Sequence, residues 1–330
     1  MLSPKPWKLE TMMRLMLSLM LCYFVGILTL CLTHFISAHG RPTLKLCLLF
    51  AGAVVLLGTA MVRVWTSFTF EKALLHLATL WVSLLLGFLL AAWVTKITGL
   101  PPPTPSFTQT IIGVVSLQGA TLVLMIPVLR QNRISWNDAF GFSANPLRAS
   151  LLGITIGSIF TPLGYTIKAW CIWVITHLPV LHLQPEEQVP VQVLQTASST
   201  MEIVALGVIT ILIAPMAEEI LFRGILYPWI RQAGFPRVAL WGTSLLFAAI
   251  HGNMAAFLPL LILAVVLAIL YEQTNNLLAP ILAHSLFNVL GFVGAYVSEK
   301  VFPILLLSLI IVVTCLFLLL RNRVASSDGV

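Results

Sequence analysis

Long apolar runs separated by short polar stretches make up most of the chain. A helix needs roughly 20 apolar residues to cross a bilayer, and ten runs reach or approach that length. They are 15–36, 44–62, 73–95, 110–129, 149–176, 203–227, 238–253, 255–272, 277–297 and 302–320. Two of them, 238–253 and 255–272, are short and almost contiguous, so the number of spans lies between eight and ten. The pattern predicts an all-α fold, a polytopic transmembrane helical bundle of about ten spans.

Composition points to the same class of protein. Hydrophobic residues make up 59% of the 330 positions and charged residues 9%, against roughly 25% charged in an ordinary soluble domain. The net charge of +7 does not indicate a nucleic-acid partner, because the lysines and arginines fall mostly between the apolar runs, where they orient helices in the bilayer. The run at 15–36 is too long for the core of a cleaved signal peptide. We expect an integral, multi-pass protein whose surroundings are the lipid bilayer.

The distribution of cations predicts an orientation. Cytoplasmic loops carry an excess of Lys and Arg. With the N-terminus in the cytoplasm and ten spans, twelve cations lie inside and four outside. Both termini are therefore expected in the cytoplasm. Two cations remain within spans: Lys168, close enough to the outer end of its helix to extend to the membrane surface, and Arg223, which needs another explanation.

The longest polar stretch, "LQPEEQVPVQVLQTASST", covers 183–200 and suggests a division of the chain. Helices before it carry almost no ionisable residue at depth, and helices after it carry most of them. We therefore expect four parts. They are an N-terminal transmembrane extension (1–182), a polar loop (183–202), a core with the candidate chemistry (203–297), and a last transmembrane helix with a short cytoplasmic tail (298–330).

Three short motifs within that core combine polar residues at four-residue spacing. They are Glu218-Glu219-x-x-x-Arg223, Phe247-x-x-x-His251 and His284-x-x-x-Asn288. Residues four apart lie on one face of a helix, one turn apart. Charged residues inside a transmembrane segment usually face the protein interior and are functional candidates.

The first motif separates its charges into two roles. Glu219 and Arg223 can pair along their own helix, which explains how an arginine is tolerated at that depth. Glu218 points about 100° away from the pair, toward other helices. A carboxylate and a histidine in a partly dry cavity suit general-base activation of water. A second histidine with an asparagine one turn on offers two donors to an oxyanion. Water attack on a carbonyl is the reaction that these groups fit.

The three motifs, in this order over about 70 residues, resemble the CPBP family of intramembrane proteases. That family includes the type II CAAX prenyl endopeptidases and the Abi bacteriocin-immunity proteins. The resemblance covers roughly 200–295, and all three motifs are intact. No part of the first 180 residues contributes to it.

Carried over residue by residue, the resemblance implies a catalytic role for Glu218, His251, His284 and Asn288. Glu218 would be the general base, assisted by His251, while His284 and Asn288 would stabilise the oxyanion. The supporting residues would be Glu219 and Arg223, which orient the site, and Phe247, which packs behind it.

No cofactor is expected, although a divalent metal remains an alternative. The chain has no His-Glu-x-x-His motif. A zinc site would have to be assembled from Glu218, His251 and His284 on three different helices.

The predicted function is that of an intramembrane endopeptidase that hydrolyses a peptide bond by Glu/His water activation. The expected partner is a membrane-associated protein or peptide substrate, with lipidation left open. One alternative is a catalytically silent, Abi-like membrane scaffold or immunity protein, in which the polar residues serve as interhelical contacts. A less favoured alternative is a proton-coupled transporter, which lacks the broken-helix repeats that such folds often show.

The predicted helix boundaries leave a conflict. At 1.5 Å per residue, Glu218 lies roughly 13 Å and His284 roughly 10 Å from the expected cytoplasmic ends of their helices, but His251 lies roughly 20 Å in. If the three residues act together, either the helix that carries His251 begins later or it is strongly tilted.

Overall fold

The computed structural model describes residues 5, 7–39, 44–66, 105–177 and 187–297, and five single positions between 301 and 311. Every regular element in this described part is a helix, which confirms the all-α class. The expected span at 73–95 and nearly all of the one at 302–320 lie outside the described residues. The total number of spans therefore stays a prediction.

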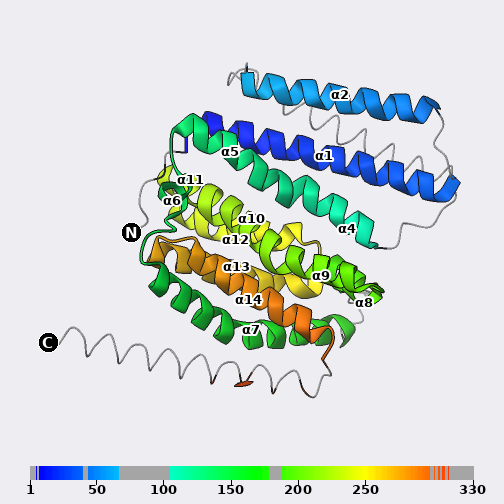
Figure 1. Ribbon diagram of the computed structural model, residues 1–330. Helices are drawn as coiled ribbons and strands as arrows, with labels where there is room; N and C mark the ends of the chain where they lie inside the picture. The colour runs from blue at the N-terminus through cyan, green and yellow to red at the C-terminus, as the bar shows by residue number, and fades with distance from the viewer. Residues whose placement is uncertain are drawn as a thin grey trace. The chain divides into compact units, whose positions relative to one another are not determined.

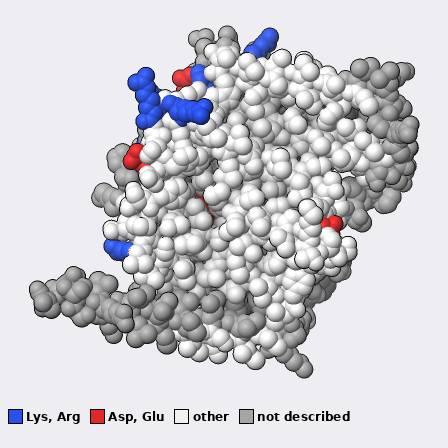
Figure 2. Space-filling model, in the orientation of Figure 1, with Lys and Arg blue, Asp and Glu red and all other residues white. Residues whose placement is uncertain are grey.

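Five described helices are long and apolar enough to cross a membrane. They are Leu9–Ile36, Phe107–Asn132, Pro146–His177, Thr200–Gln232 and Met254–Thr274. Three shorter apolar helices accompany them at Phe50–Thr66, Pro236–Ile250 and Leu278–Gly294. The face drawn in Figure 2 is almost entirely uncharged, with most of its Lys, Arg, Asp and Glu atoms near the margins. The chain is an integral membrane protein.

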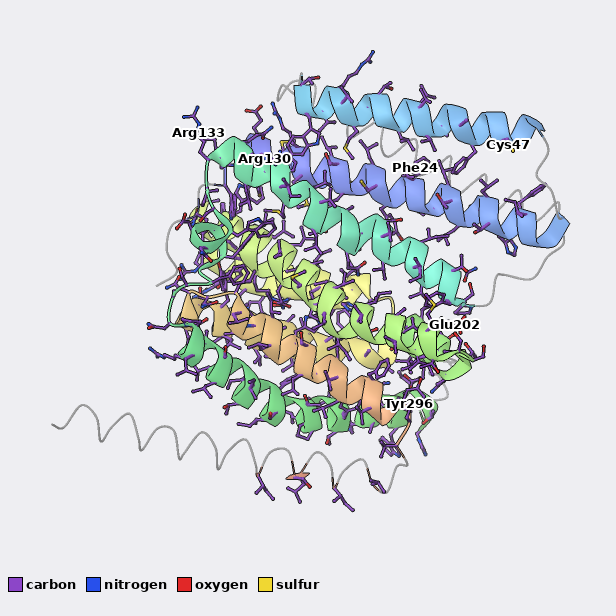
Figure 3. All side chains as sticks on the ribbon, in the orientation of Figure 1. Phe24, Cys47, Arg130, Arg133, Glu202 and Tyr296 are labelled. Atoms are coloured by element: carbon purple, nitrogen blue, oxygen red, sulfur yellow. The ribbon has the colours of Figure 1, made fainter. Side chains whose placement is uncertain are left out.

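The chain divides into two compact units, of which Pro6–Arg133 forms one. Its elements are α1 (Leu9–His39), α2 (Leu44–Thr66), α4 (Phe107–Val114), the π-helical turn η1 (Val115–Gly119) and α5 (Ala120–Asn132). The indole nitrogen of Trp65 donates to Ser18 Oγ at 2.8 Å and links α2 to α1. Arg130 and Arg133 lie together at one end of α5 (Figure 3).

The other unit comprises Met1–Lys5 and 134–330. Its described helices are α6 (Trp136–Phe140), α7 (Pro146–His177), α8 (Val189–Thr196), α9 (Thr200–Val208), η3 (Ile209–Ile213), α10 (Ala214–Glu219), η4 (Ile220–Leu226), α11 (Tyr227–Gln232), α12 (Pro236–Ile250), α13 (Met254–Thr274) and α14 (Leu278–Gly294). The segments α9 to α11 form one continuous helix, Thr200–Gln232. Apart from Met1–Lys5, this unit begins at Ile134, well before the boundary at 183 that the polar loop suggested.

Helix α7 packs closely against α14 and α13 (Figure 1). The contact with α14 depends on two glycines. A Cβ on Gly153 would lie 2.4 Å from the carbonyl oxygen of Ala279, and a Cβ on Gly157 would lie 2.9 Å from Ala283 Cα. Small residues at such positions let two membrane helices bring their backbones together. Although α7 precedes the polar loop, it is therefore part of the unit that holds the three motifs.

The turn between α13 and α14 is covered by the chain around α6. Asn276 Nδ2 donates to the carbonyl of Ala144 at 2.8 Å, and the backbone N–H of Leu277 donates to the carbonyl of Phe140 at 2.9 Å. Phe140 and Asn276 are fully buried. Backbone polar groups buried away from water need hydrogen-bond partners. The chain around α6 supplies such partners to the buried turn where α14 starts.

Candidate active site

The two adjacent glutamates lie at the C-terminal end of α10, between two π-helical turns. The turn η3 precedes α10, and η4 follows directly after Glu219. Pro215 has no backbone N–H to donate to the preceding turn, and wider turns of this kind are frequent at functional sites. Glu218 and Glu219 leave this segment in different directions, as their adjacency on a helix requires.

Glu219 is the centre of a fully buried ionic cluster. Its Oε1 accepts from Arg223 Nη1 at 2.7 Å, which is the pair that the spacing predicted. The same oxygen lies 2.9 Å from His284 Nδ1 on α14. Arg223 also donates from Nη2 to the carbonyl of Ala264 on α13 at 2.9 Å. The cluster thus ties three helices together around one carboxylate oxygen, while Glu219 Oε2 has no hydrogen-bond partner among the described residues.

Glu218 faces both histidines of the motifs. Its Oε2 lies 3.9 Å from His251 Nε2 and 3.9 Å from His284 Nε2. The side chain of Glu218 is 14% exposed and that of His251 is 22% exposed, whereas His284 is almost fully buried. Glu218 and His251 can therefore be reached from outside the protein, and the ionic cluster behind them cannot.

The positions of the helix ends remove the conflict in depth between Glu218 and His251, whereas His284 still lies six residues, roughly 9 Å, after the start of α14 at Leu278. The helix that carries the glutamates continues to Gln232, not 227. Glu218 lies 14 residues, roughly 21 Å, before that end. His251 lies 15 residues, roughly 22 Å, after the start of α12 at Pro236. His251 reaches the level of Glu218 because α12 spans only part of a bilayer and ends at that depth.

The hydrogen bonds of the two rings assign a proton to Nδ1 in each. His251 Nδ1 lies 2.6 Å from the carbonyl oxygen of Phe247, an acceptor, so this nitrogen must be the donor. His284 Nδ1 faces the carboxylate of Glu219 in the same way. In the neutral form of either ring, Nε2 then presents a lone pair toward Glu218.

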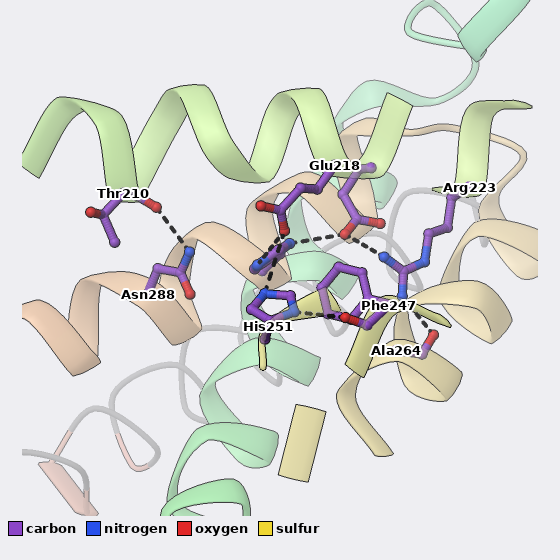
Figure 4. A network of polar contacts seen from close by, with 9 residues as sticks. Thr210, Glu218, Arg223, Phe247, His251, Ala264 and Asn288 are labelled. Carbon is purple, nitrogen blue, oxygen red and sulfur yellow. Dashed lines mark hydrogen bonds and ion pairs between the residues drawn. The ribbon is translucent and has the colours of Figure 1, made fainter. Parts of the chain in front are cut away.

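Phe247 is buried and contacts the aromatic and cationic groups of the site (Figure 4). Its ring centroid lies 4.9 Å from that of His251 and 5.6 Å from that of His284, the latter edge-on. The guanidinium carbon of Arg223 lies 4.7 Å from the same centroid. The ring thus contacts both histidines and lies under the cation, a favourable arrangement that agrees with packing behind the site.

Asn288 lies to one side of Glu218 and His251 in Figure 4. Its Nδ2 donates to the carbonyl of Thr210, in η3, at 2.8 Å. One of its two amide hydrogens is thus used for contact with a neighbouring helix. Sequence patterns could not have found the carbonyls of Thr210 and Ala264, because any residue type can supply a backbone carbonyl.

The metal ligands that the sequence left as an alternative are Glu218, His251 and His284. Their donor atoms, one carboxylate oxygen and two imidazole nitrogens, suit zinc chemically. In the described part of the chain, however, no three His, Cys, Asp or Glu side chains form a group that could hold a metal ion. The spacing of 3.9 Å is wider than the roughly 3.4 Å between ligands of a tetrahedral ion with bonds of about 2.05 Å.

Comparison with known proteins finds a protease family to which one segment of the chain is similar. Residues 200–290 match the family described as type II CAAX prenyl endopeptidase Rce1-like, which is a protease family. The match confirms the resemblance to the CPBP family over this segment and covers all three motifs.

Two curated bacterial proteins are similar over part of the chain. The uncharacterized protein YpbD of Bacillus subtilis is 36% identical over 84 residues, which cover 24% of this chain and 40% of that protein. The UPF0177 protein YxdF of Lactococcus lactis is 30% identical over 95 residues, which cover 28% of this chain and 52% of that protein. The chain thus spans about half or less of each relative. No solved structure matches it significantly.

Proposed function

We propose that the protein is an intramembrane endopeptidase that uses Glu218 to activate water. The observation that carries the proposal is the position of Glu218 Oε2, 3.9 Å from the Nε2 atoms of both His251 and His284. A water molecule bound between Glu218 and His251 can donate one hydrogen to each. Both side chains are partly exposed, so a substrate can approach that water.

Hydrolysis then proceeds in two steps. Glu218 removes a proton as the water oxygen attacks the carbonyl carbon of the peptide bond, and the carbonyl oxygen becomes an oxyanion. Glu218 next returns the proton to the amide nitrogen, the C–N bond breaks, and an acid and an amine leave. Water and the peptide are the only reactants, so the reaction needs no electron donor or acceptor.

The different partners of the two histidines support different roles. His251 donates from Nδ1 to a neutral carbonyl, and its Nε2 lone pair can accept from the attacking water. Donation to an oxyanion by His284 requires a proton on Nε2 as well as on Nδ1, which means an imidazolium ring. Glu219, at 2.9 Å, supplies the negative charge that balances this ring.

Asn288 completes the oxyanion site in this proposal. Its bond to Thr210 holds the amide plane, and the second hydrogen on Nδ2 is available to the oxyanion. Two donors fixed before the reaction stabilise the developing charge without reorganisation. Glu219, Arg223 and Phe247 act as positioning residues, since Glu219, held by Arg223, orients His284 and Phe247 contacts both histidines.

The proposed substrate is a membrane-associated protein or peptide, with or without a lipid group. The site is proposed to open toward the cytoplasmic side of the bilayer, where both termini are also proposed to lie. The chemistry is proposed to need no metal, because a carboxylate and an imidazole suffice to activate the water.

Replacement of Glu218 by Gln tests the proposal. Purified, detergent-solubilised protein is incubated with membrane-protein peptides, and products are identified by mass spectrometry. Glu218→Gln should abolish cleavage. The matched control is Glu202→Gln on the same helix, because Gln can replace Glu at this position of the capping box with Ser199. Unchanged turnover by Glu218→Gln would eliminate the proposed base, and peptide binding without cleavage by the unmodified protein would favour a scaffold.

A comparison of membrane proteomes identifies the substrate. Cells with the unmodified protein are compared with cells that carry Glu218→Ala. Proteins that accumulate uncleaved only in the variant are the candidate substrates. Their C-terminal or internal cleavage positions then show whether a lipid group is required.

A further inference from the structure

A cavity of about 450 Å³ lies among α7, α8, α13 and α14. Its wall includes Tyr165 and Ala169 on α7, Val191 on α8, Leu260 on α13 and Phe287 on α14. The volume is within the range of about 300–1,000 Å³ typical of ligand sites. No motif of the sequence pointed to it.

Helix α13 connects the cavity to the ionic cluster. The carbonyl of Ala264 accepts a hydrogen bond from Arg223. Leu260 and Ala256, which precede Ala264 on the same helix, both line the cavity. These three residues are four apart and share one face. The cavity therefore begins about one helical turn, roughly 6 Å along the axis, from the cluster.

Helix α14 makes the same connection from the other side. His284 and Asn288 belong to the candidate site, whereas Phe287 and Gly291 line the cavity. Phe287 is adjacent to Asn288 in sequence, and Gly291 lies one turn beyond it. A peptide whose carbonyl oxygen lies near Asn288 would place neighbouring residues at the cavity.

The chemistry of the wall favours an uncharged, apolar occupant. The charged pair in the wall, Lys168 and Glu187, forms an ion pair at 2.6 Å. An ion entering the cavity would have to displace one member of that pair or remain unpaired, at a cost in free energy. The aliphatic and aromatic residues of the wall offer contact to an apolar group instead.

Small residues of α14 form part of the cavity wall and admit the side chain of Tyr165. A Cβ on Gly291 would lie 2.3 Å from the hydroxyl oxygen of Tyr165, and the Tyr165 ring packs against Phe287 at 5.6 Å between centroids. Ala295, at the end of α14, and Gly294 also line the cavity. Tyr296, labelled in Figure 3, directly follows them. Gly294 and Ala295 carry no large side chain that would fill the cavity from α14.

We propose that this cavity is a specificity subsite that receives an apolar side chain of the peptide substrate near the cleaved bond. The proposal rests on the proposed endopeptidase function and adds the substrate preference. An apolar side chain at one defined position should favour cleavage, and a charged one should oppose it.

The substitution Ala169→Phe tests the subsite. Ala169 lines the cavity and is itself exposed, so a larger side chain can fill the space without disturbing the buried core. The matched control is Thr166→Phe, an exposed position on the same helix that does not line the cavity. Peptides carry Ala, Leu, Phe, Lys or Asp at each position around the cleaved bond, and kcat/KM is measured for each.

The unmodified protein should prefer Leu or Phe over Lys or Asp at one position by at least 10-fold. Ala169→Phe should lower kcat/KM for Phe at that position about 10-fold relative to Ala, leaving other positions unchanged. Thr166→Phe should behave as the unmodified protein. If Ala169→Phe shows the same preference for an apolar side chain as the unmodified protein, the subsite proposal is wrong and the peptidase proposal still stands.

A second measurement does not depend on turnover. Peptides that carry a photoreactive phenylalanine analogue are cross-linked to the Glu218→Gln variant. The analogue stands at the preferred position, or at each position in turn when no preference is measured. Labelled residues are mapped by mass spectrometry. Cross-links should fall within 164–172, 191–195 or 287–295. Cross-links only elsewhere, or none, would overturn the subsite, whereas cross-links there without cleavage by the unmodified protein would overturn only the peptidase.

Discussion

His284 Nδ1 lies 2.9 Å from Glu219 Oε1, so the glutamate that faces away from the proposed water orients the ring that faces it. Arg223 binds the same oxygen at 2.7 Å. The adjacent glutamates are therefore joined through one imidazole, whose Nδ1 contacts Glu219 and whose Nε2 lies 3.9 Å from Glu218. The stability of the buried cluster and the proposed chemistry both depend on the His284 ring. Substitutions of the residues around this ring should therefore differ in whether they lower the stability or the catalytic rate.

Replacement of Arg223 by Met should strongly destabilise the protein. It leaves Glu219 buried without its cation, a change that typically costs about 3–5 kcal/mol. In the double variant Glu219→Gln with Arg223→Met, both members of the buried ion pair are removed, so much of that loss should be recovered. Thermal unfolding in detergent measures both variants. A double variant less stable than Arg223→Met would contradict a buried ion pair at this position.

His251→Ala should lower kcat by about 10²–10⁴-fold, the usual contribution of a general acid or base. Stability should change little, since His251 follows the end of α12 and is partly exposed. The control is His177→Ala, an exposed histidine at the end of α7, for which unchanged kcat is expected. Equal rates for both variants would remove His251 from the proposed mechanism.

Asn288→Asp should reduce kcat by about 10²–10³-fold with little change in KM, because the oxyanion loses a donor. The control is Asn132→Asp, which removes a similar side-chain bond to the carbonyl of Val128 in the other unit. That variant should retain full kcat. A rise in KM with kcat unchanged for Asn288→Asp would instead indicate a role in substrate binding.

Gly153→Ala should destabilise the unit by about 1–3 kcal/mol, the usual cost of overpacking, because its Cβ would meet the carbonyl of Ala279 at 2.4 Å. Gly242→Ala is the control, since its Cβ makes only an ordinary contact with Val238 and alanine favours the helix. Melting temperatures in detergent compare the two. An unshifted melting temperature for Gly153→Ala would show that α7 and α14 are not in close contact.

Chelation should leave activity unchanged. Dialysis against a divalent-metal chelator is followed by the peptide assay and by elemental analysis of the purified protein. We expect full activity and no stoichiometric zinc, because Glu218 and His251 activate the water in the proposal. Loss of activity that zinc restores would establish a metal at Glu218, His251 and His284.

Local patterns in the sequence were sufficient for the helices and for one contact of the site. Apolar runs of membrane length predicted the longer described helices, but not the short helices α6 and α8, of which α8 lies within the stretch expected to be a polar loop. The spacing of Glu219 and Arg223 predicted their ion pair, since residues four apart meet on any helix. The order of the three motifs was enough to predict the family that residues 200–290 match.

Sequence patterns predicted the ends of the helices less accurately than their positions. The span expected to end at 227 continues to Gln232, because the apolar pattern fades before the hydrogen-bonded helix stops. That difference of five residues produced the apparent mismatch in depth between Glu218 and His251.

The sequence by itself thus determined an all-helical membrane protein with three polar motifs, because these features depend on neighbours within a few residues. Only the tertiary structure decided which partners those motifs have. It brings His284 to Glu219, turns Asn288 toward Thr210, and places α7 beside α13 and α14 to enclose the cavity. Such contacts join residues far apart in the chain, often through backbone carbonyls or missing side chains, and no residue pattern specifies them.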